Sequence, residues 1–258
     1  MSKRIAFIFF IVIIFSQSIF QSCVNSENLR KIKKDFETVQ LVENQSIDVD
    51  SLINLIPSYK QICKNINKFC GTFNPNNLLP LENVFLYENS KQTAIVFGMY
   101  MADLGYARHF ERVQFCMNEL NAVQTLAQKL AVGEQEFKEI VPQIEQNLEN
   151  KDTLYAIIDS LMAKSKNFLS DKERASLNYL FLSGFWLESG YIALNNCQIN
   201  DDIKQQHLSL LSTILQLLNT LEDKDLISNL KTDLIKIETN KTLDLETINM
   251  VREKYILK

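Results

Sequence analysis

The chain has 258 residues, of which only 6 are Gly and 4 are Pro. These two residues make up about 4 % of the chain against about 12 % in average proteins, and β-rich folds need both for their turns, so a many-stranded β fold is excluded. Hydrophobic residues account for 46 % and charged residues for 22 %, which excludes a disordered chain. The formal net charge of −4 argues against a nucleic-acid partner. With two histidines and no glycine-rich loop, we predict neither a metal site nor a cofactor.

The first 22 residues are typical of a secretory signal. Lys3 and Arg4 precede an uncharged apolar stretch at 5–15, which is too short to span a bilayer as a helix. Ser22 and Cys23 follow, and a small residue before a cysteine at this place resembles the lipobox of bacterial lipoproteins, although Phe20 and Gln21 depart from its usual residues. We therefore predict a signal peptide over 1–22 and acyl chains such as palmitate on Cys23. An ordinary cleaved signal and an uncleaved anchor are the alternatives.

Residues 23–47 are predicted to form the lipidated N-terminus and a tether helix. The segment is mostly polar and charged, and its apolar residues recur at helical spacing at Leu29, Ile32, Phe36 and Val39. A helix of this kind packs loosely or serves as a stalk between the membrane and the body of the protein.

The remaining residues, 48–258, are predicted to form one helical domain, because no change in composition marks a second one. The longest irregular stretch is expected at 72–88, which holds Pro75 and Pro80 and is a candidate for a functional loop. Apolar periodicity and capping residues beyond it predict helices joined by short connections, which favour antiparallel neighbours. The fold class is therefore all-α, an antiparallel multi-helix bundle. The predicted helices span 90–110, 112–131, 134–148, 151–167, 171–196, 202–221, 224–239 and 244–256.

Four cysteines lie beyond Cys23, and an exported protein can join such residues in disulfides. Cys63 and Cys70 are about 10 Å apart on a straight helix, which is beyond bridging distance. We interpret these two residues, together with Cys116 and Cys197, as mostly buried small hydrophobic side chains. The sequence leaves their disulfide state open.

Two of the predicted helices carry similar segments. Residues 98–106 read Gly-Met-Tyr-Met-Ala-Asp-Leu-Gly-Tyr, and residues 183–191 read Ser-Gly-Phe-Trp-Leu-Glu-Ser-Gly-Tyr. Each has small residues early, an aromatic residue three positions before an acid, and then Gly-Tyr. The similarity favours two pseudo-repeated halves, with chance similarity as the alternative. A tetratricopeptide array is disfavoured because its period of about 34 residues is missing.

These two segments, taken with Ile56-Pro57-Ser58, Phe73-Asn74-Pro75 and Tyr87, resemble an uncharacterised all-helical family of envelope lipoproteins of Bacteroidetes. The resemblance runs over residues 50–200, and its specific parts are Ala-Asp-Leu-x-Tyr at 102–106 and Trp-x-Glu-x-x-Tyr at 186–191. It implies a lipid-anchored helical protein of the bacterial outer membrane. The family has no established activity, so the resemblance implies no mechanism.

Asp103 and Glu188, each surrounded by apolar residues, are the candidate functional acids. On their helices, Asp103 shares a face with Tyr106 and Glu188 shares one with Tyr191. If the helices pack together, two acids in an apolar setting shift each other's pKa in the way that general acid–base chemistry requires.

The alternative role for the two acids is structural, and we favour it. We expect both acids to be largely buried on adjacent helices, with Tyr106 and Tyr191 or an arginine such as Arg108 or Arg112 satisfying them.

Two further aromatic residues, Tyr100 and Trp186, are candidates for stacking on a ligand, with core packing as the default. His109 is predicted at a helix end and His207 is predicted to be partly exposed, and no nucleophile lies in a strand-turn-helix context. The chain thus carries no complete catalytic constellation.

The leading functional hypothesis is a lipid-anchored helical module that binds a partner protein or a small ligand without catalysis. Some Bacteroidetes lipoproteins reach the cell surface through an acidic stretch just after the lipidated cysteine. Residues 24–28 contain one acid, Glu27, so a periplasm-facing orientation is favoured. The alternatives are an envelope enzyme that uses Asp103 and Glu188 as an acid–base pair, and a purely structural envelope protein.

Overall fold

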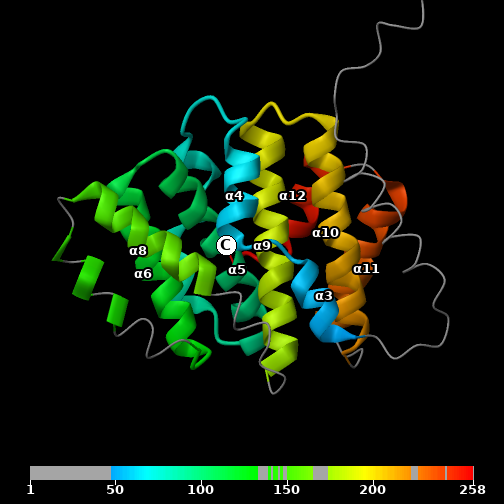
Figure 1. Cartoon of the computed structure of the whole chain (residues 1–258). Coiled ribbons are helices and arrows are strands. Elements are labelled where there is room, and N and C mark those ends of the chain that lie inside the picture. Colours follow the sequence, from blue (N-terminus) through cyan, green and yellow to red (C-terminus); the bar gives the residue numbers. More distant parts are fainter. Residues whose placement is uncertain are drawn as a thin grey trace, which may run out of the picture. The chain divides into compact units, whose positions relative to one another are not determined.

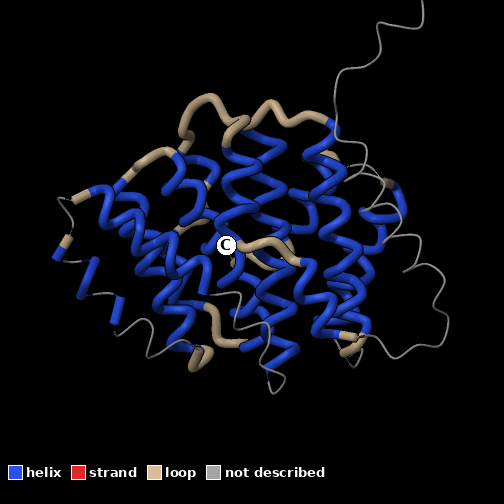
Figure 2. Tube along the Cα trace, in the orientation of Figure 1, coloured by secondary structure: helices blue, strands red, loops and turns tan. Residues whose placement is uncertain are grey.

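The computed structural model describes residues 48–132, 139–140, 142–144, 146–147, 150–164, 174–221, 226–241 and 243–257. The predicted signal peptide, Cys23 and the tether helix lie outside these residues, as does part of the helix predicted at 134–148. Residues Asp48–Lys258 form one compact unit. Within the described part of this unit, all regular structure is helical and no β-strand occurs (Figures 1 and 2), which confirms the all-α prediction.

The named helices follow the predicted ranges closely from residue 90 onward. Two α-helices and two short 3-10 helices, η1 and η2, precede this region. In chain order the bounds are α3 Val49–Leu55, α4 Tyr59–Asn67, η1 Pro75–Asn77, η2 Leu81–Leu86, α5 Ser90–His109, α6 Val113–Lys129, α8 Lys151–Lys164, α9 Ala175–Asn196, α10 Asp201–Asn219, α11 Leu226–Asn240 and α12 Leu245–Glu253.

Several helices begin at a short polar side chain that accepts a hydrogen bond from the first turn. Asn89 accepts from the backbone N–H groups of Lys91 and Gln92 at the start of α5. Asn200 and Asp244 cap α10 and α12 in the same manner. These side chains satisfy N–H groups that have no partner within the helix, which explains why the helices begin where they do.

Helices α5 and α9 form the centre of the unit and pack against each other more extensively than any other described pair (Figure 1). Both carry the similar segments, and glycines allow their backbones to meet. A Cβ atom on Gly98 would overlap the carbonyl oxygen of Phe181, and one on Gly184 would overlap that of Ile95. Gly98 and Gly184 thus let the two helices approach closely, whereas Gly190 faces the His207 ring.

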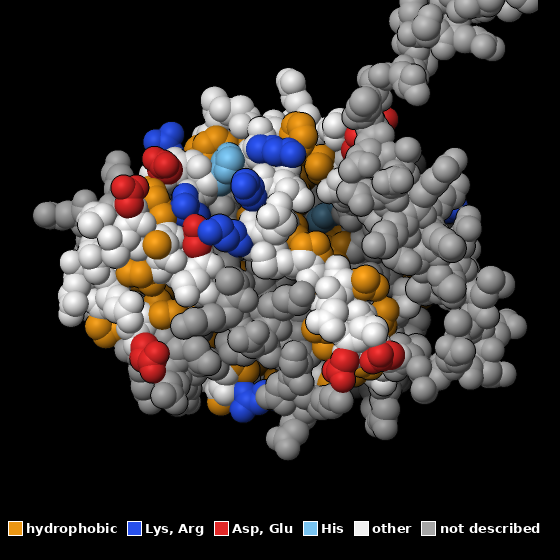
Figure 3. Space-filling view, in the orientation of Figure 1, with side chains coloured by type: hydrophobic (Ala, Val, Ile, Leu, Met, Phe, Trp, Pro, Cys, Tyr) orange, Lys and Arg blue, Asp and Glu red, His pale blue; other side chains and the backbone are white. Residues whose placement is uncertain are grey.

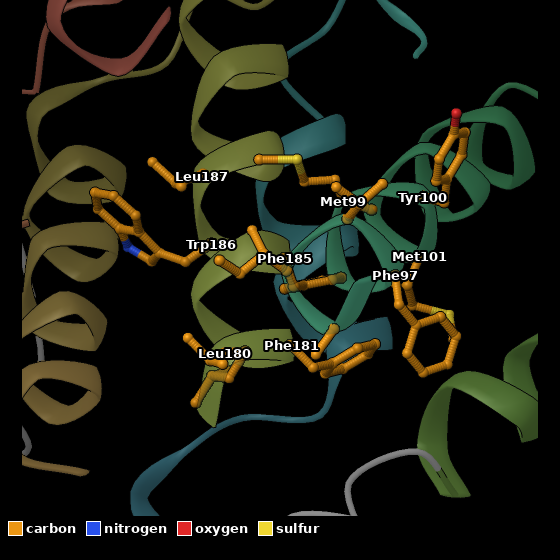
Figure 4. Close-up of a cluster of buried hydrophobic side chains, with 14 of the residues drawn as sticks. Phe97, Met99, Tyr100, Met101, Leu180, Phe181, Phe185, Trp186 and Leu187 are labelled. Atoms are coloured by element: carbon orange, nitrogen blue, oxygen red, sulfur yellow. The ribbon is translucent and has the colours of Figure 1, made fainter. Parts of the chain in front are cut away.

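Large apolar side chains fill the space on both sides of α9 (Figure 4). Phe181 and Phe185 point toward α5, where the rings of Phe97 and Phe181 lie 4.7 Å apart between centroids. Trp186 points the other way, toward α10. Because α9 is apolar on all sides, it has to be surrounded by other helices, and this explains its central place.

A disulfide joins Cys70, just after α4, to Cys197 at the end of α9. The interpretation of all four cysteines as simple hydrophobic residues is therefore wrong for this pair. The two residues are 127 positions apart in sequence, and such a distance gives no signal of pairing. Cys63 and Cys116 are free and buried, as predicted.

On the face of the unit shown in Figure 3, hydrophobic side chains lie in small groups between polar and charged ones. The most exposed large apolar side chain among the described residues is that of Phe85, next to the exposed Leu86 at the end of η2. None of the described helices combines the length and the apolar character needed to cross a bilayer.

Candidate functional site

Glu188, near the middle of α9, forms an ion pair inside the core. Its two carboxylate oxygens accept hydrogen bonds from Arg252 of α12, from Nε at 2.6 Å and from Nη2 at 2.9 Å. The Glu188 side chain is fully buried and that of Arg252 is 7 % exposed. The guanidinium also lies 4.2 Å from the centre of the Tyr191 ring, so the cation has an aromatic contact in addition to the carboxylate.

Asp103 of α5 lies beside this pair and is also fully buried. Its Oδ2 atom accepts a hydrogen bond of 2.8 Å from the backbone N–H of Leu79. Its Oδ1 atom has no hydrogen-bond donor, and the Glu188 carboxyl lies within hydrogen-bonding reach of the Asp103 side chain. The predicted burial of both acids on adjacent helices is thus confirmed.

A third acid, Glu119 of α6, completes the cluster, and the sequence analysis did not single it out. It is 1 % exposed, and its Oε2 atom has no partner among the described residues. The signal was available, because Glu119 interrupts an apolar stripe at helical spacing. The other members of this stripe are Cys116, Leu120, Val123, Leu126 and Ala127. We use the name acid cluster for Asp103, Glu119, Glu188 and Arg252.

Electrostatics within the acid cluster are set by burial and by the shortage of positive charge. Burial and the nearby Glu188 carboxylate raise the pKa of Asp103 well above its usual range and raise the pKa of Glu119 to about 8. Burial also raises the pKa of Glu188, but the paired Arg252 opposes this effect. Glu188 is therefore the carboxyl of the three that is best able to stay ionised.

The segment at 72–88 closes the acid cluster from one side. Besides the Leu79 N–H on Asp103, the carbonyl of Pro80 accepts a hydrogen bond of 2.7 Å from the Tyr100 hydroxyl. The Tyr87 hydroxyl in turn accepts one of 3.2 Å from the backbone N–H of Leu257. This stretch, the candidate for a functional loop, thus packs over the core through these hydrogen bonds.

Tyr106 does not satisfy either acid, contrary to the prediction. Its hydroxyl accepts hydrogen bonds from the backbone N–H of Asn74 at 2.9 Å and from the Asn196 side chain at 2.6 Å. It also lies 3.4 Å from the carbonyl of Thr72 as a donor. The Tyr106 hydroxyl thus links the 72–88 segment to the end of α9, close to the disulfide. Its hydrogen bonds go to Asn74, Thr72 and Asn196 instead of to the acids.

Tyr191 supports the cluster through its ring and not through its hydroxyl. The ring lies under Arg252, while the hydroxyl accepts a hydrogen bond of 3.3 Å from Asn195 one turn further along α9. The prediction that a tyrosine or an arginine satisfies the acids therefore holds for Glu188 through Arg252 alone. Arg108 is engaged elsewhere, with Asp159 at 3.3 Å, and Arg112 lies 5.6 Å from the Phe73 ring.

Tyr100 and Trp186 are core residues with no exposed surface, so the ligand-stacking alternative is wrong for both. The Trp186 ring stacks on His207 at 4.6 Å between centroids, and its Nε1 donates to the His207 carbonyl at 2.8 Å. His207 Nε2 returns a hydrogen bond of 3.0 Å to the Trp186 carbonyl. His207 is 5 % exposed, and burial lowers its pKa to about 4, so the predicted partial exposure is also wrong.

An open groove of about 580 Å³ lies at a different place, between α11, the residues that directly follow α12, and the first turn of α5. On its floor the buried Asp233 accepts two hydrogen bonds from Lys254, at 2.7 and 2.8 Å. Lys236 lies 3.9 Å from the same carboxylate. The lining residues are Gln92, Leu226, Asn229, Thr232, Asp233, Lys236, Lys254 and Tyr255.

Comparison with known proteins returns no matching family model, no matching curated protein and no matching solved structure. Among the described residues, no three His, Cys, Asp or Glu side chains are arranged to hold a metal ion.

Proposed function

We propose that this chain is a lipid-anchored helical module of the bacterial envelope that binds a partner protein or a small ligand without catalysis. In this proposal Cys23 carries the lipid, the body faces the periplasm from the outer membrane, and the protein belongs with the Bacteroidetes lipoproteins that its segments at 98–106 and 183–191 resemble.

The observation that carries the non-catalytic role is the closure of the acid cluster. Asp103 and Glu188 have no exposed surface, and Glu188 is bound on both oxygens by Arg252. An acid–base pair must reach within hydrogen-bond distance of its substrate, and a group closed off in this way has no such access. The enzyme alternative therefore loses its candidate residues.

Two other features support an exported binding module. Structural disulfides persist in oxidising compartments such as the periplasm, and Cys70 is joined to Cys197. The groove over Asp233 has a volume within the range of about 300–1,000 Å³ that small-molecule sites occupy. Its lysine, amide and hydroxyl groups can contact a polar ligand or a polar surface of a partner.

The lipid anchor is tested by growing cells that express the chain with a labelled fatty acid. We expect label on the wild-type protein and none on the Cys23→Ala variant, with Cys63→Ala as the matched control that keeps the label. Label that persists on Cys23→Ala would contradict the anchor.

The binding role is tested by placing a photo-crosslinking amino acid in living cells at Thr232, which is exposed in the groove, or at Gln205, which is exposed on α10. A specific adduct at Thr232 that is absent at Gln205 supports binding in the groove. Equal, weak crosslinking at both positions argues for the purely structural alternative.

A further inference from the structure

The acid cluster brings together three carboxyl groups and one guanidinium in a space closed to water. Asp103 comes from α5, Glu119 from α6 and Glu188 from α9, and Arg252 of α12 binds Glu188. If all three acids were ionised, the buried group would carry two uncompensated negative charges. Burying an unpaired charge is so costly that the group takes up a proton instead.

Hydrogen bonding indicates which acids hold the protons. Glu188 has both oxygens on Arg252, so it is the carboxylate of the ion pair. Asp103 accepts from Leu79 with Oδ2, whereas its Oδ1 is buried without a hydrogen-bond donor. The Asp103 and Glu188 carboxyls lie within hydrogen-bonding reach of each other, and two carboxyls share a hydrogen bond only when one of them is protonated. The buried Oε2 of Glu119 also has no hydrogen-bond partner among the described residues, so a negative charge on this carboxyl would be left unsatisfied.

We propose that the folded chain keeps Asp103 and Glu119 protonated at neutral pH, so that the core holds one guanidinium–carboxylate pair between two neutral carboxyl groups. Folding at neutral pH then takes up two protons from the solvent, and the fold is itself sensitive to pH.

The other titratable groups that face the cluster do not supply the missing positive charge. Tyr87, Tyr100 and Tyr191 are phenols whose pKa values burial raises, so they stay neutral. Cys63 on α4 is neutral for the same reason, because burial raises its pKa to about 12. Glu253 lies at the edge, where it accepts a hydrogen bond of 3.3 Å from Arg252, and adds negative charge.

The sign of the pH dependence follows from the raised pKa values. An unfolded Asp or Glu loses its proton near pH 4, whereas the folded Asp103 and Glu119 keep theirs until higher pH. Between these limits the folded state binds more protons, so stability falls as pH rises. Each retained proton increases the unfolding equilibrium constant by about tenfold per pH unit in this window.

The first experiment measures urea unfolding of the full chain in detergent from pH 5 to pH 7.5, for the wild type, Asp103→Asn, Glu119→Gln and the control Asp159→Asn. Asp159 is an acid whose partners, Lys60 and Arg108, lie outside the cluster. With each rise of one pH unit, the unfolding constant of Asp103→Asn or Glu119→Gln should increase by a factor about ten times smaller than that of the wild type, because each variant lacks one of the two retained protons. The control should shift the curve without changing its slope, and equal slopes for all four proteins would overturn the proposal.

The second measurement does not depend on the variants being stable. The infrared spectrum of the folded wild-type protein at pH 7 should show the carbonyl band of a buried protonated carboxylic acid, which disappears on unfolding. If the band is absent from the folded protein, the acids are ionised and the proposal is wrong.

Discussion

Glu188 and Arg252 illustrate how one pair of residues makes a core depend on a distant helix. They lie 64 positions apart in sequence, and both are buried. In a low-dielectric interior the attraction offsets the cost of desolvation only while both partners are present. The consequence is unequal sensitivity: losing one partner is costly, and replacing both by apolar side chains is not.

The first prediction concerns this pair. Glu188→Gln leaves the buried Arg252 without a charged partner on α9 and should lower the free energy of unfolding by about 3–5 kcal/mol. The double variant Glu188→Leu with Arg252→Met should recover most of this loss, because it removes both charges and keeps the volume filled. Urea unfolding at pH 6 measures both. A double variant that is less stable than Glu188→Gln would contradict the prediction, because the ion pair would then add stability beyond offsetting the burial of its two charges.

At the scale of elements, α5 and α9 are held by a contact between backbones. The carbonyl oxygens of Ile95 and Phe181 occupy the space where side chains of Gly184 and Gly98 would lie. Because both obstacles are backbone atoms, they cannot rotate away as a side chain would. The two helices would have to separate to accept even one methyl group.

The second prediction follows from this contact. Gly98→Ala and Gly184→Ala should each destabilise the protein by about 1–3 kcal/mol or more through overpacking, despite the higher helix propensity of alanine. Gly71→Ala is the control, since no heavy atom lies within 4 Å of the place its Cβ would take. It should change the stability by less than about 0.5 kcal/mol. Thermal melts of the three variants that coincide would contradict the packing argument.

The sequence predicted most of the helices because each leaves a local signal, namely an apolar period and a capping side chain. The stripe of leucines on α10 is an example of the first signal. It also predicted that Asp103 and Glu188 are buried, because an acid in an otherwise apolar helix segment has no polar face to lie on.

The partners of these acids could not be predicted from sequence. Arg252 lies on α12, a short amphipathic helix far along the chain from Glu188, and an arginine on such a helix is ordinarily a surface residue. The Leu79 N–H that reaches Asp103 belongs to an irregular segment with no period to place it. Pairings of this kind depend on the tertiary arrangement, and local patterns contain no information on it.

At the scale of the whole unit, the Cys70–Cys197 disulfide closes a long loop that contains α5, α6, α8 and α9. The same place holds the Asn74 and Asn196 hydrogen bonds to Tyr106, so covalent and polar links fasten the 72–88 segment to the end of α9. Closing a loop of this length removes much of the freedom of the unfolded chain.

The third prediction tests that link. Chain-entropy arguments give about 5 kcal/mol for a loop of this size, so Cys197→Ser should lower the free energy of unfolding by an amount of this order. Reductant should destabilise the wild type and leave Cys197→Ser unchanged, because Cys63 and Cys116 are free thiols already. Urea midpoints with and without reductant measure both effects. A reductant effect of equal size on both proteins would exclude the disulfide as its cause.

The backbone contact between α5 and α9 has a consequence for how the sequence can change over time. Where helices meet through side chains, the distance between their axes follows the size of those side chains, and one substitution calls for another across the interface. At Gly98 and Gly184 the spacing is set by the peptide groups themselves. A change in the size of a neighbouring core side chain therefore leaves a cavity or a clash instead of moving the two helices closer or further apart, provided that these two positions stay glycine.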